Sequence, residues 1–194
     1  MNETREYIID QAYNLFLNHS YEAVSISDIS KAIGLTKGAL YHHFKNKEEL
    51  FKSVVDKYIQ FIGFKNVDEL TLAESHKLRH ELTCKGLKLM FGQFTEFVPA
   101  NYIALVSDAF RHYPEFAQRM NNFIDSETEK TKQVLDNAVK RGEIRSDVDT
   151  TILADNYIAI TIGMAGNLMH NKALEEVLES LRLQLQELYK LLKK

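Results

Sequence analysis

Cysteine is almost missing from this sequence, and long apolar runs are missing altogether. The single cysteine among 194 residues, Cys84, rules out an intramolecular disulfide and fits a reducing compartment. No apolar run approaches the roughly 18 residues that a membrane-spanning helix needs, and the N-terminal segment lacks the apolar core of a signal peptide. We therefore expect a cytoplasmic protein that has no membrane partner.

A surplus of positive charge is missing as well. The chain has 24 lysine and arginine residues against 27 aspartate and glutamate residues, which gives a formal net charge of −3. This balance argues against a protein that coats nucleic acid non-specifically, and residues 1–50 are not basic overall either. Any DNA binding must therefore come from a locally basic face, which makes it sensitive to salt and dependent on two copies for tight binding.

The sequence also lacks the motifs of common enzyme classes. It has no glycine-rich phosphate loop, nucleophile elbow, paired-histidine metalloprotease signature or Ser-His-Asp constellation. Strand patterns, internal repeats and low-complexity tracts are absent, whereas apolar residues recur at helical spacing along a chain that is 45% hydrophobic. We therefore predict an all-α protein with a substantial core, no enzymatic activity and no cofactor.

The most informative stretch that the sequence does contain is Ser25–Lys47, which begins with a short helix. Ser25 and Asp28 have the spacing of a capping box, in which the hydroxyl and the carboxylate each accept an N–H at the helix start. Isoleucines recur at helical spacing until Gly34, which can adopt the positive φ that ends a short helix tightly.

A second short helix follows the turn at Gly34 and Leu35. Thr36 can cap a helix that runs from Lys37 to Phe44, with Leu40 and Phe44 on its inner side. The outward side carries Thr36, Lys37, Gly38, Tyr41 and His42. Two short helices joined at a steep angle by a glycine-containing turn form a helix-turn-helix.

The charge of this motif distinguishes it from an ordinary helical corner. From Lys31 to Lys47 the chain has four lysines, two histidines and no aspartate or glutamate. Such a face suits phosphate, and the small residue Gly38 lets the second helix come close to DNA. The alternative is a merely solvated patch, which the coincidence with helix-turn-helix spacing disfavours. The predicted DNA-binding residues are Ser25, Thr36, Lys37, Gly38, Tyr41, His42 and Lys47.

Four segments of the chain carry a family resemblance. They are TREYIIDQAYNLF at 4–16, SISDI at 25–29, GLTKGALYHHF at 34–44 and KEEL at 47–50. In these segments the chain resembles the N-terminal domain of TetR-family transcriptional regulators, over about the first quarter of its length. Ser20 departs from the family, which commonly has glycine after the first helix, but this departure affects a loop and not the DNA face.

The resemblance implies an organisation and a set of partners. It implies a three-helix DNA-binding domain at residues 1–47 and a larger helical regulatory and dimerisation domain at residues 48–194. It also implies a homodimer that binds a palindromic operator in double-stranded DNA, acting as a repressor that a small-molecule effector releases.

Helical spacing continues through the rest of the chain. Gly63–Leu70 is the best candidate for a joint between domains, and Thr71 with Glu74 repeats the capping-box pattern. Prolines at 99 and 114 stop helices. Outside the helix-turn-helix, the predicted helices are residues 3–18, 47–62, 71–97, 101–112, 115–141, 152–170 and 174–192.

The last two helices, at about residues 150–170 and 174–192, carry more apolar surface than one fold-back contact needs. Gly163 and Gly166 in the first of them would let another helix approach closely. The second has a heptad-like seam of Leu174, Leu178, Leu181, Leu185, Leu188 and Leu192. We therefore predict a homodimer through residues 150–192, and the alternative is that both helices simply complete the core of one protomer.

A ligand pocket is the second site that the resemblance implies. TetR-like regulators commonly hold a small-molecule pocket in the helical C-terminal domain, although aromatic stripes in a helical protein are usually core. The candidate lining residues are Phe61, Phe91, Phe94, Tyr102, Phe110, Tyr113, Phe116, Met120 and Phe123. We predict no metal site at His76, His80 and Cys84, because their spacing fans the three side chains around a straight helix.

The predicted helix at 47–62 gives a hypothesis for regulation. A mostly apolar ligand bound among the helices between about residues 58 and 170 would tilt this helix and change the spacing of the two recognition helices. The opposing hypothesis is a helical dimer whose regulatory domain binds a protein partner. A dimer that binds protein in place of DNA would leave the acid-free face from Lys31 to Lys47 unexplained.

Overall fold

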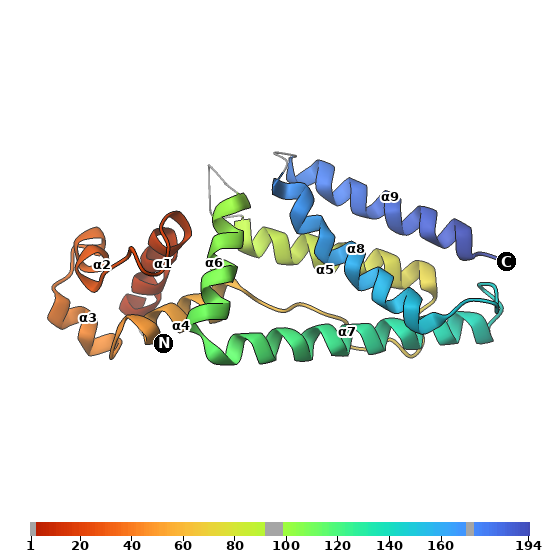
Figure 1. Cartoon of the computed structure of the whole chain (residues 1–194), viewed down its shortest axis with the longest axis horizontal. Helices are drawn as coiled ribbons and strands as arrows, with labels where there is room; N and C mark the ends of the chain where they lie inside the picture. Colours follow the sequence, from red (N-terminus) through yellow and green to blue (C-terminus); the bar gives the residue numbers. More distant parts are fainter. Residues whose placement is uncertain (1–2, 92–98, 170–172) are drawn as a thin grey trace. The chain divides into compact units, whose positions relative to one another are not determined.

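The computed structural model describes residues 3–91, 99–169 and 173–194, without the side chains of residues 90, 91, 99, 165, 166, 168 and 169. This part of the chain is helical and contains no strand, only an isolated β-bridge between Ile144 and Lys193. The helices, shown in Figure 1, are α1 (Glu3–Asn18), α2 (Ile26–Ile33), α3 (Lys37–His43), α4 (Lys47–Tyr58), α5 (Leu72–Phe91), α6 (Pro99–His112), α7 (Pro114–Lys140), α8 (Thr150–Met169) and α9 (Leu174–Leu192). The prediction of an all-α fold with an N-terminal helix-turn-helix is confirmed.

Most helices begin and end within two residues of their predicted bounds. One exception is α5, which was predicted to reach Phe97, but residues 92–97 lie outside the described part of the chain. The other exception is α4, which was predicted to reach Ile62 and ends at Tyr58. The prediction is therefore wrong for the last turn of this helix.

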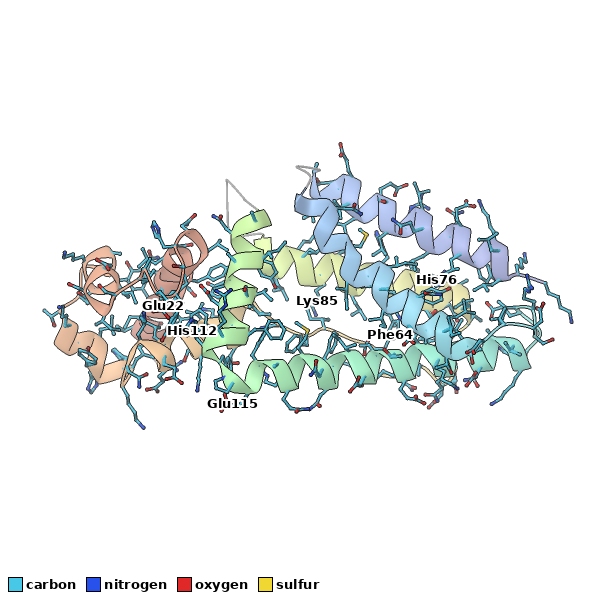
Figure 2. All side chains as sticks on the ribbon, in the orientation of Figure 1. Glu22, Phe64, His76, Lys85, His112 and Glu115 are labelled. Atoms are coloured by element: carbon cyan, nitrogen blue, oxygen red, sulfur yellow. The ribbon has the colours of Figure 1, made fainter. Side chains whose placement is uncertain are left out.

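The residues after α4 leave the helix because side chains of α7 bind their backbone. The Phe64 N–H donates to both carboxylate oxygens of Glu127, at 3.1 Å each, and the Phe64 carbonyl accepts from Lys130 Nζ at 2.7 Å. Phe64 is labelled in Figure 2, where it lies alongside α7. Gly63 passes so close to the Glu127 carboxylate that a Cβ there would also come within 2.9 Å of the Phe123 ring. This tertiary contact holds the chain in its non-helical course after α4.

The predicted caps of the short helices are formed. The Ser25 N–H and hydroxyl donate to Asp28 Oδ2 at 3.0 and 2.5 Å, and the Asp28 N–H donates to Ser25 Oγ at 3.2 Å. Thr36 Oγ1 accepts the Ala39 N–H at 3.2 Å at the start of α3. Gly34 ends α2 with a φ of 68°, a left-handed conformation that favours glycine.

By their contacts, the described residues group into two compact units. The first contains residues 1–60 with 94–119, and the second contains residues 61–93 with 120–194. The predicted division into domains at 1–47 and 48–194 stays a prediction. Within the first unit α1 packs on α2, α4 and α6, so a helix distant in sequence belongs to the unit that holds the helix-turn-helix.

The first unit is closed by contacts between α1 and α4. The rings of Tyr13 and Tyr58 stack with their centroids 3.7 Å apart, and the Tyr58 hydroxyl donates to Asp10 at 2.7 Å. Burial raises the pKa of Tyr13 to about 12. Lys57 on α4 adds ion pairs with Asp10 and, at 2.9 Å, with Glu6. The small helices α2 and α3 therefore rest on a firmly joined helix pair.

The second unit contains α5, α8, α9 and most of α7. In Figure 1, α9 runs beside α5 and α8, and it packs against both of them. Across the unit, Arg79 Nη2 on α5 donates to Thr131 Oγ1 on α7 at 2.6 Å. No helix in the described ranges is both long and apolar enough to cross a membrane.

The leucine seam of α9 faces the interior of its own protomer. Leu181 and Leu185 are 0% and 1% exposed, whereas Leu183 and Leu191 on the opposite side are 45% and 72% exposed. The seam thus completes the core of the second unit. Any surface that α9 offers to a second copy must come from its other side.

Two glycine substitutions test how the backbone supports this fold. Gly34→Ala should lower the free energy of unfolding by about 1 kcal/mol, because alanine is strained at a φ of 68°. Gly86→Ala is the matched control inside α5, where a Cβ meets no atom within 4 Å. It should raise the free energy of unfolding by about 0.5–1 kcal/mol, since alanine favours a helix interior. Urea unfolding followed by circular dichroism measures both, and equal effects would contradict the argument.

Candidate DNA-binding surface and ligand cavity

Helix α3 presents most of the predicted DNA-binding side chains to solvent. Leu40 is fully buried and holds the helix on the first unit, while Tyr41 is 52% exposed. Lys37, Gly38 and His42 are exposed as well. A helix of seven residues is too short to be stable alone, so its packing through Leu40 and Phe44 keeps this surface in place.

Two of the predicted DNA-binding side chains, Ser25 and Thr36, use their hydroxyl groups to cap helices. Ser25 Oγ is engaged in the capping box of α2, and Thr36 Oγ1 accepts an N–H of α3. The hydrogen bonds from Ser25 hold the pKa of the exposed Asp28 carboxyl below its usual value. Both hydroxyls therefore mark the starts of the two helices, and their contact with DNA stays a prediction.

Lys47 is placed differently from the exposed lysines at 31, 37 and 45. Its Nζ donates to the Tyr21 carbonyl at 2.9 Å and lies 4.0 Å from the centroid of the Tyr21 ring. The side chain is half-buried and braces the loop between α1 and α2. The predicted contact of Lys47 with phosphate stays a prediction. The bond to Tyr21 does not rule it out, because the ammonium group has three N–H donors.

The loop residue Tyr21 organises this part of the first unit, and no pattern in the sequence marks it. Its N–H donates to Asp108 Oδ2 on α6 at 2.7 Å, and its ring stacks on His112 with centroids 4.1 Å apart. Glu22 lies 3.4 Å from His112 Nε2, and both residues are labelled in Figure 2. Such contacts join residues about ninety positions apart, which periodicity cannot reveal.

A small cavity of about 80 Å³ lies inside the second unit. Helices α5, α7 and α8 and the segment after α4 supply its walls. Most of the lining is apolar, and the polar groups are two threonines, one arginine and one glutamate. The lining residues are Ile62, Phe64, Arg79, Leu82, Thr83, Phe123, Ile124, Glu127, Ile158, Thr161 and Ile162.

Of the nine predicted pocket residues, the structure places Phe123 at this cavity and stacks Phe61 on it, with ring centroids 5.3 Å apart. Met120 lies one turn earlier on α7. The predicted residues of the first unit, away from this cavity's lining, are Tyr102, Phe110, Tyr113 and Phe116. The side chain of Phe91 and all of Phe94 lie outside the described part. The pocket residues predicted from the sequence are aromatic except for Met120, whereas the apolar residues of the cavity wall are mainly isoleucine and leucine.

The histidines and the cysteine of α5 make other contacts. His76 Nε2 lies 2.7 Å from the Tyr157 hydroxyl, and burial lowers the pKa of His76 to about 4. Cys84 Sγ lies 4.0 Å from the ring nitrogens of His80. Burial raises the pKa of the Cys84 thiol. Within the described ranges, no group of three or more such ligands is arranged to hold a metal ion.

Together, the capped α2, the tight turn at Gly34 and the exposed face of α3 define a helix-turn-helix DNA-binding protein. The model of "Bacterial regulatory proteins, tetR family" matches residues 8–54, and the model of "Tetracyclin repressor-like, C-terminal domain" matches residues 80–182. The chain belongs to the TetR family of transcriptional regulators. The prediction of the family is confirmed, and this family consists of regulators and not of enzymes.

Named relatives cover most of the chain. The transcriptional repressor ComR of Escherichia coli K12 is 28% identical over 182 residues, which are 90% of this chain and 84% of ComR. The probable regulator ArpR of Pseudomonas putida is 30% identical over 173 residues, 84% of this chain and 79% of ArpR.

Solved structures show the same fold. NalD, the secondary repressor of the MexAB-OprM multidrug efflux pump in Pseudomonas aeruginosa, matches with a TM-score of 0.67 and 19% identity over 99% of this chain and 96% of NalD. The SmeT–triclosan complex matches with a TM-score of 0.63 and 20% identity over 100% of this chain and 93% of SmeT.

The exposed face of α3 gives a direct prediction. Tyr41→Ala or His42→Ala should each weaken binding to a duplex selected from random DNA by about 1–3 kcal/mol per half-site. The melting temperature should change little, because both side chains are exposed. Tyr7→Ala on α1 is the control, since Tyr7 is 48% exposed and lies outside the helix-turn-helix. Fluorescence anisotropy measures the affinity, and undiminished binding by both variants would show that the recognition surface lies elsewhere.

A second prediction separates the two roles of Lys47. Lys47→Met should weaken binding to all sequences alike and reduce the slope of log affinity against log salt by about 0.9 for each phosphate contact removed. Lys85→Met, at an exposed position on α5, is the control that should leave the slope unchanged. A lower melting temperature with an unchanged slope would mean that Lys47 only holds the loop at Tyr21.

Proposed function

We propose that this regulator is a repressor that binds a palindromic operator as a homodimer and is released by a small-molecule effector. The observation that carries the proposal is the exposed, acid-free outer face of α3. The opposite side of the same helix is buried in the core of the first unit, so the outer face is not needed for folding. A surface of donors on a capped, close-packed helix suits the major groove of DNA. Its place of action is the cytoplasm, where the DNA is accessible.

The homodimer is supported by apolar side chains that one protomer leaves uncovered. Leu183 and Leu191 on α9 are exposed, and Ile152 and Ile162 on α8 are 58% and 54% exposed. A shallow groove between these helices is lined by four apolar residues and five polar ones, which are Ile160, Leu183, Leu188, Leu191, Glu176, Glu179, Ser180, Gln184 and Glu187. Exposed large apolar side chains rimmed by polar residues are typical of an interface, and a second copy related by a two-fold axis would cover the same side chains on both protomers.

The effector is supported by the cavity and by the solved SmeT–triclosan complex, in which a protein of the same fold holds a small molecule. A cavity of about 80 Å³ is far below the several hundred cubic ångströms of a drug-sized site. A larger effector must therefore enlarge it by moving the helices around it. Such a movement is what couples binding to a change of conformation.

Helix α7 could transmit this movement to the helix-turn-helix. The sequence suggests a longer α4 for the same role. Phe123, Ile124 and Glu127 of α7 line the cavity. The first turns of the same helix bind α4, because Arg119 pairs with Asp56. Tyr113, just before α7, donates to Asp56 at 3.1 Å. A shift of α7 at the cavity would therefore pull on α4 and change the spacing of the two recognition helices.

A combined experiment tests the dimer and the operator. Duplexes selected by the full-length protein from random DNA should contain inverted repeats, because two recognition helices related by a two-fold axis meet inverted half-sites. Leu183→Glu together with Leu191→Glu should convert the dimer to a monomer by light scattering and weaken binding to the selected duplex more than tenfold. Leu89→Glu, an exposed leucine on α5 that is 44% exposed, is the control. A dimer that persists in the double variant would assign the interface to another surface.

The alternative function is a dimer whose second unit binds a protein partner in place of a small molecule. The observation that favours it is the same exposed apolar side of α8 and α9. It predicts that the double leucine variant remains a dimer but loses the partner. Light scattering combined with a measurement of partner binding distinguishes the two functions, because a persisting dimer by itself only assigns the interface to another surface.

A further inference from the structure

Arg79 is buried in the second unit at a place where the described residues offer it no carboxylate partner. The side chain lies on α5 and is 7% exposed. Its Nη2 donates to Thr131 Oγ1 at 2.6 Å, and its guanidinium lies 4.8 Å from the centroid of the Phe64 ring. A neutral hydroxyl and an aromatic face satisfy part of its hydrogen bonding, but neither balances its charge.

The nearest acidic group, Glu127, is already engaged elsewhere. Its carboxylate accepts the Phe64 N–H and pairs with Lys130 Nζ at 3.0 Å. Burial lowers the pKa of Arg79 to about 10, and the charge of Glu127 only partly opposes this shift. Among the described residues, Arg79 therefore has no ion pair of its own, since Glu127 is paired with Lys130, a side chain that is 31% exposed.

The Arg79 side chain lines the cavity. Arg79 and Glu127 are the ionisable residues of its lining, and isoleucine, leucine and phenylalanine side chains form most of the remaining wall. A buried cation beside an otherwise apolar space favours a ligand with a negative head and an apolar body. A cavity of about 150 Å³ accommodates benzene. The present cavity of about 80 Å³ therefore suits a ligand of fewer than six non-hydrogen atoms.

We propose that the cavity binds a small aliphatic carboxylic acid, whose carboxylate rests on the Arg79 guanidinium and whose alkyl group packs against Ile124 and Ile158. The planar guanidinium presents paired N–H donors that match the two oxygens of a carboxylate. The effect of the acid on DNA binding rests on the proposed function, whereas the binding of the acid to the cavity does not. Longer acids would need the cavity to enlarge.

Propionate is the probe, because its five non-hydrogen atoms fit the cavity. Sodium propionate added to the full-length protein at constant ionic strength should raise the melting temperature and shift the NMR signals of residues around the cavity. Propionamide, which has the same shape without the charge, should bind at least tenfold more weakly. Arg79→Met should weaken propionate binding at least tenfold. Arg182→Gln is the control, since Arg182 is exposed on α9 and pairs with Glu179 at 2.5 Å.

Two further variants keep the test decisive if Arg79→Met does not fold. Glu127→Gln retains an oxygen that can accept the Phe64 N–H and removes the one carboxylate from the lining. Propionate should therefore bind this variant at least as tightly as the unmodified protein. Thr161→Leu fills the cavity while leaving the guanidinium in place, and it should weaken propionate binding at least tenfold.

The outcomes separate this inference from the proposed function. Equal affinity for propionate and propionamide, or equal affinity of the unmodified protein and Thr161→Leu, would overturn the site. Displacement of propionate by inorganic phosphate or chloride at equal concentration would also overturn it, by showing a site for anions without an apolar body. Operator affinity is measured in the same samples. If propionate binds through Arg79 but leaves operator affinity unchanged, the site stands and its role as an effector site fails.

Discussion

The buried carboxylate of Glu127 is the interaction on which the second unit depends. It accepts the N–H of Phe64, pairs with Lys130 and lies against Gly63, where a side chain would collide with it. These contacts hold the segment after α4 on α7. They also engage the Glu127 carboxylate, so that Arg79 lines the cavity without an ion pair of its own among the described residues. The course of this segment and part of the cavity wall therefore have one physical origin, which is the cost of burying a carboxylate unless each of its oxygens is hydrogen-bonded.

In the first unit, the seven-residue helix α3 is held at the surface with its polar face exposed. Caps at Ser25 and Thr36 satisfy the N–H groups that begin α2 and α3, and Leu40 anchors α3 to the core. The loop before α2 is held by Tyr21, which binds α6 through Asp108 and α4 through Lys47. The exposed side chains of Lys37, Tyr41 and His42 on this face have no part in those contacts. This separation is what allows the face to be altered while the unit remains folded.

Helix α9 has one side buried in its own protomer and the other side exposed. Leu181 and Leu185 pack inward, and Leu183 and Leu191 remain exposed. The sequence pattern predicted a seam and a dimer from the same leucines, since a heptad repeat does not reveal which partner a helix meets first. The protomer core takes the seam because α5 and α8 lie beside it. The side left over carries the exposed leucines on which the proposed dimer rests, at positions that the heptad pattern did not mark.

The sequence by itself determined the helices, their caps, the helix-turn-helix and the family, because these depend on residues within a few positions of one another. Ser25 with Asp28, Gly34 and Thr36 each act through local geometry, and each was predictable for that reason. Tertiary structure alone decided the course of the chain after Tyr58, where the cavity lies and what the leucine side of α9 packs against. Glu127 meets Phe64 across 63 positions, and Tyr21 meets Asp108 across 87. Such contacts follow from how helices pack, which a periodic pattern leaves open. Phe123 is the predicted pocket residue that lines this cavity, and the isoleucines beside it were not predicted, since no local signal distinguishes a core isoleucine from one that lines a cavity.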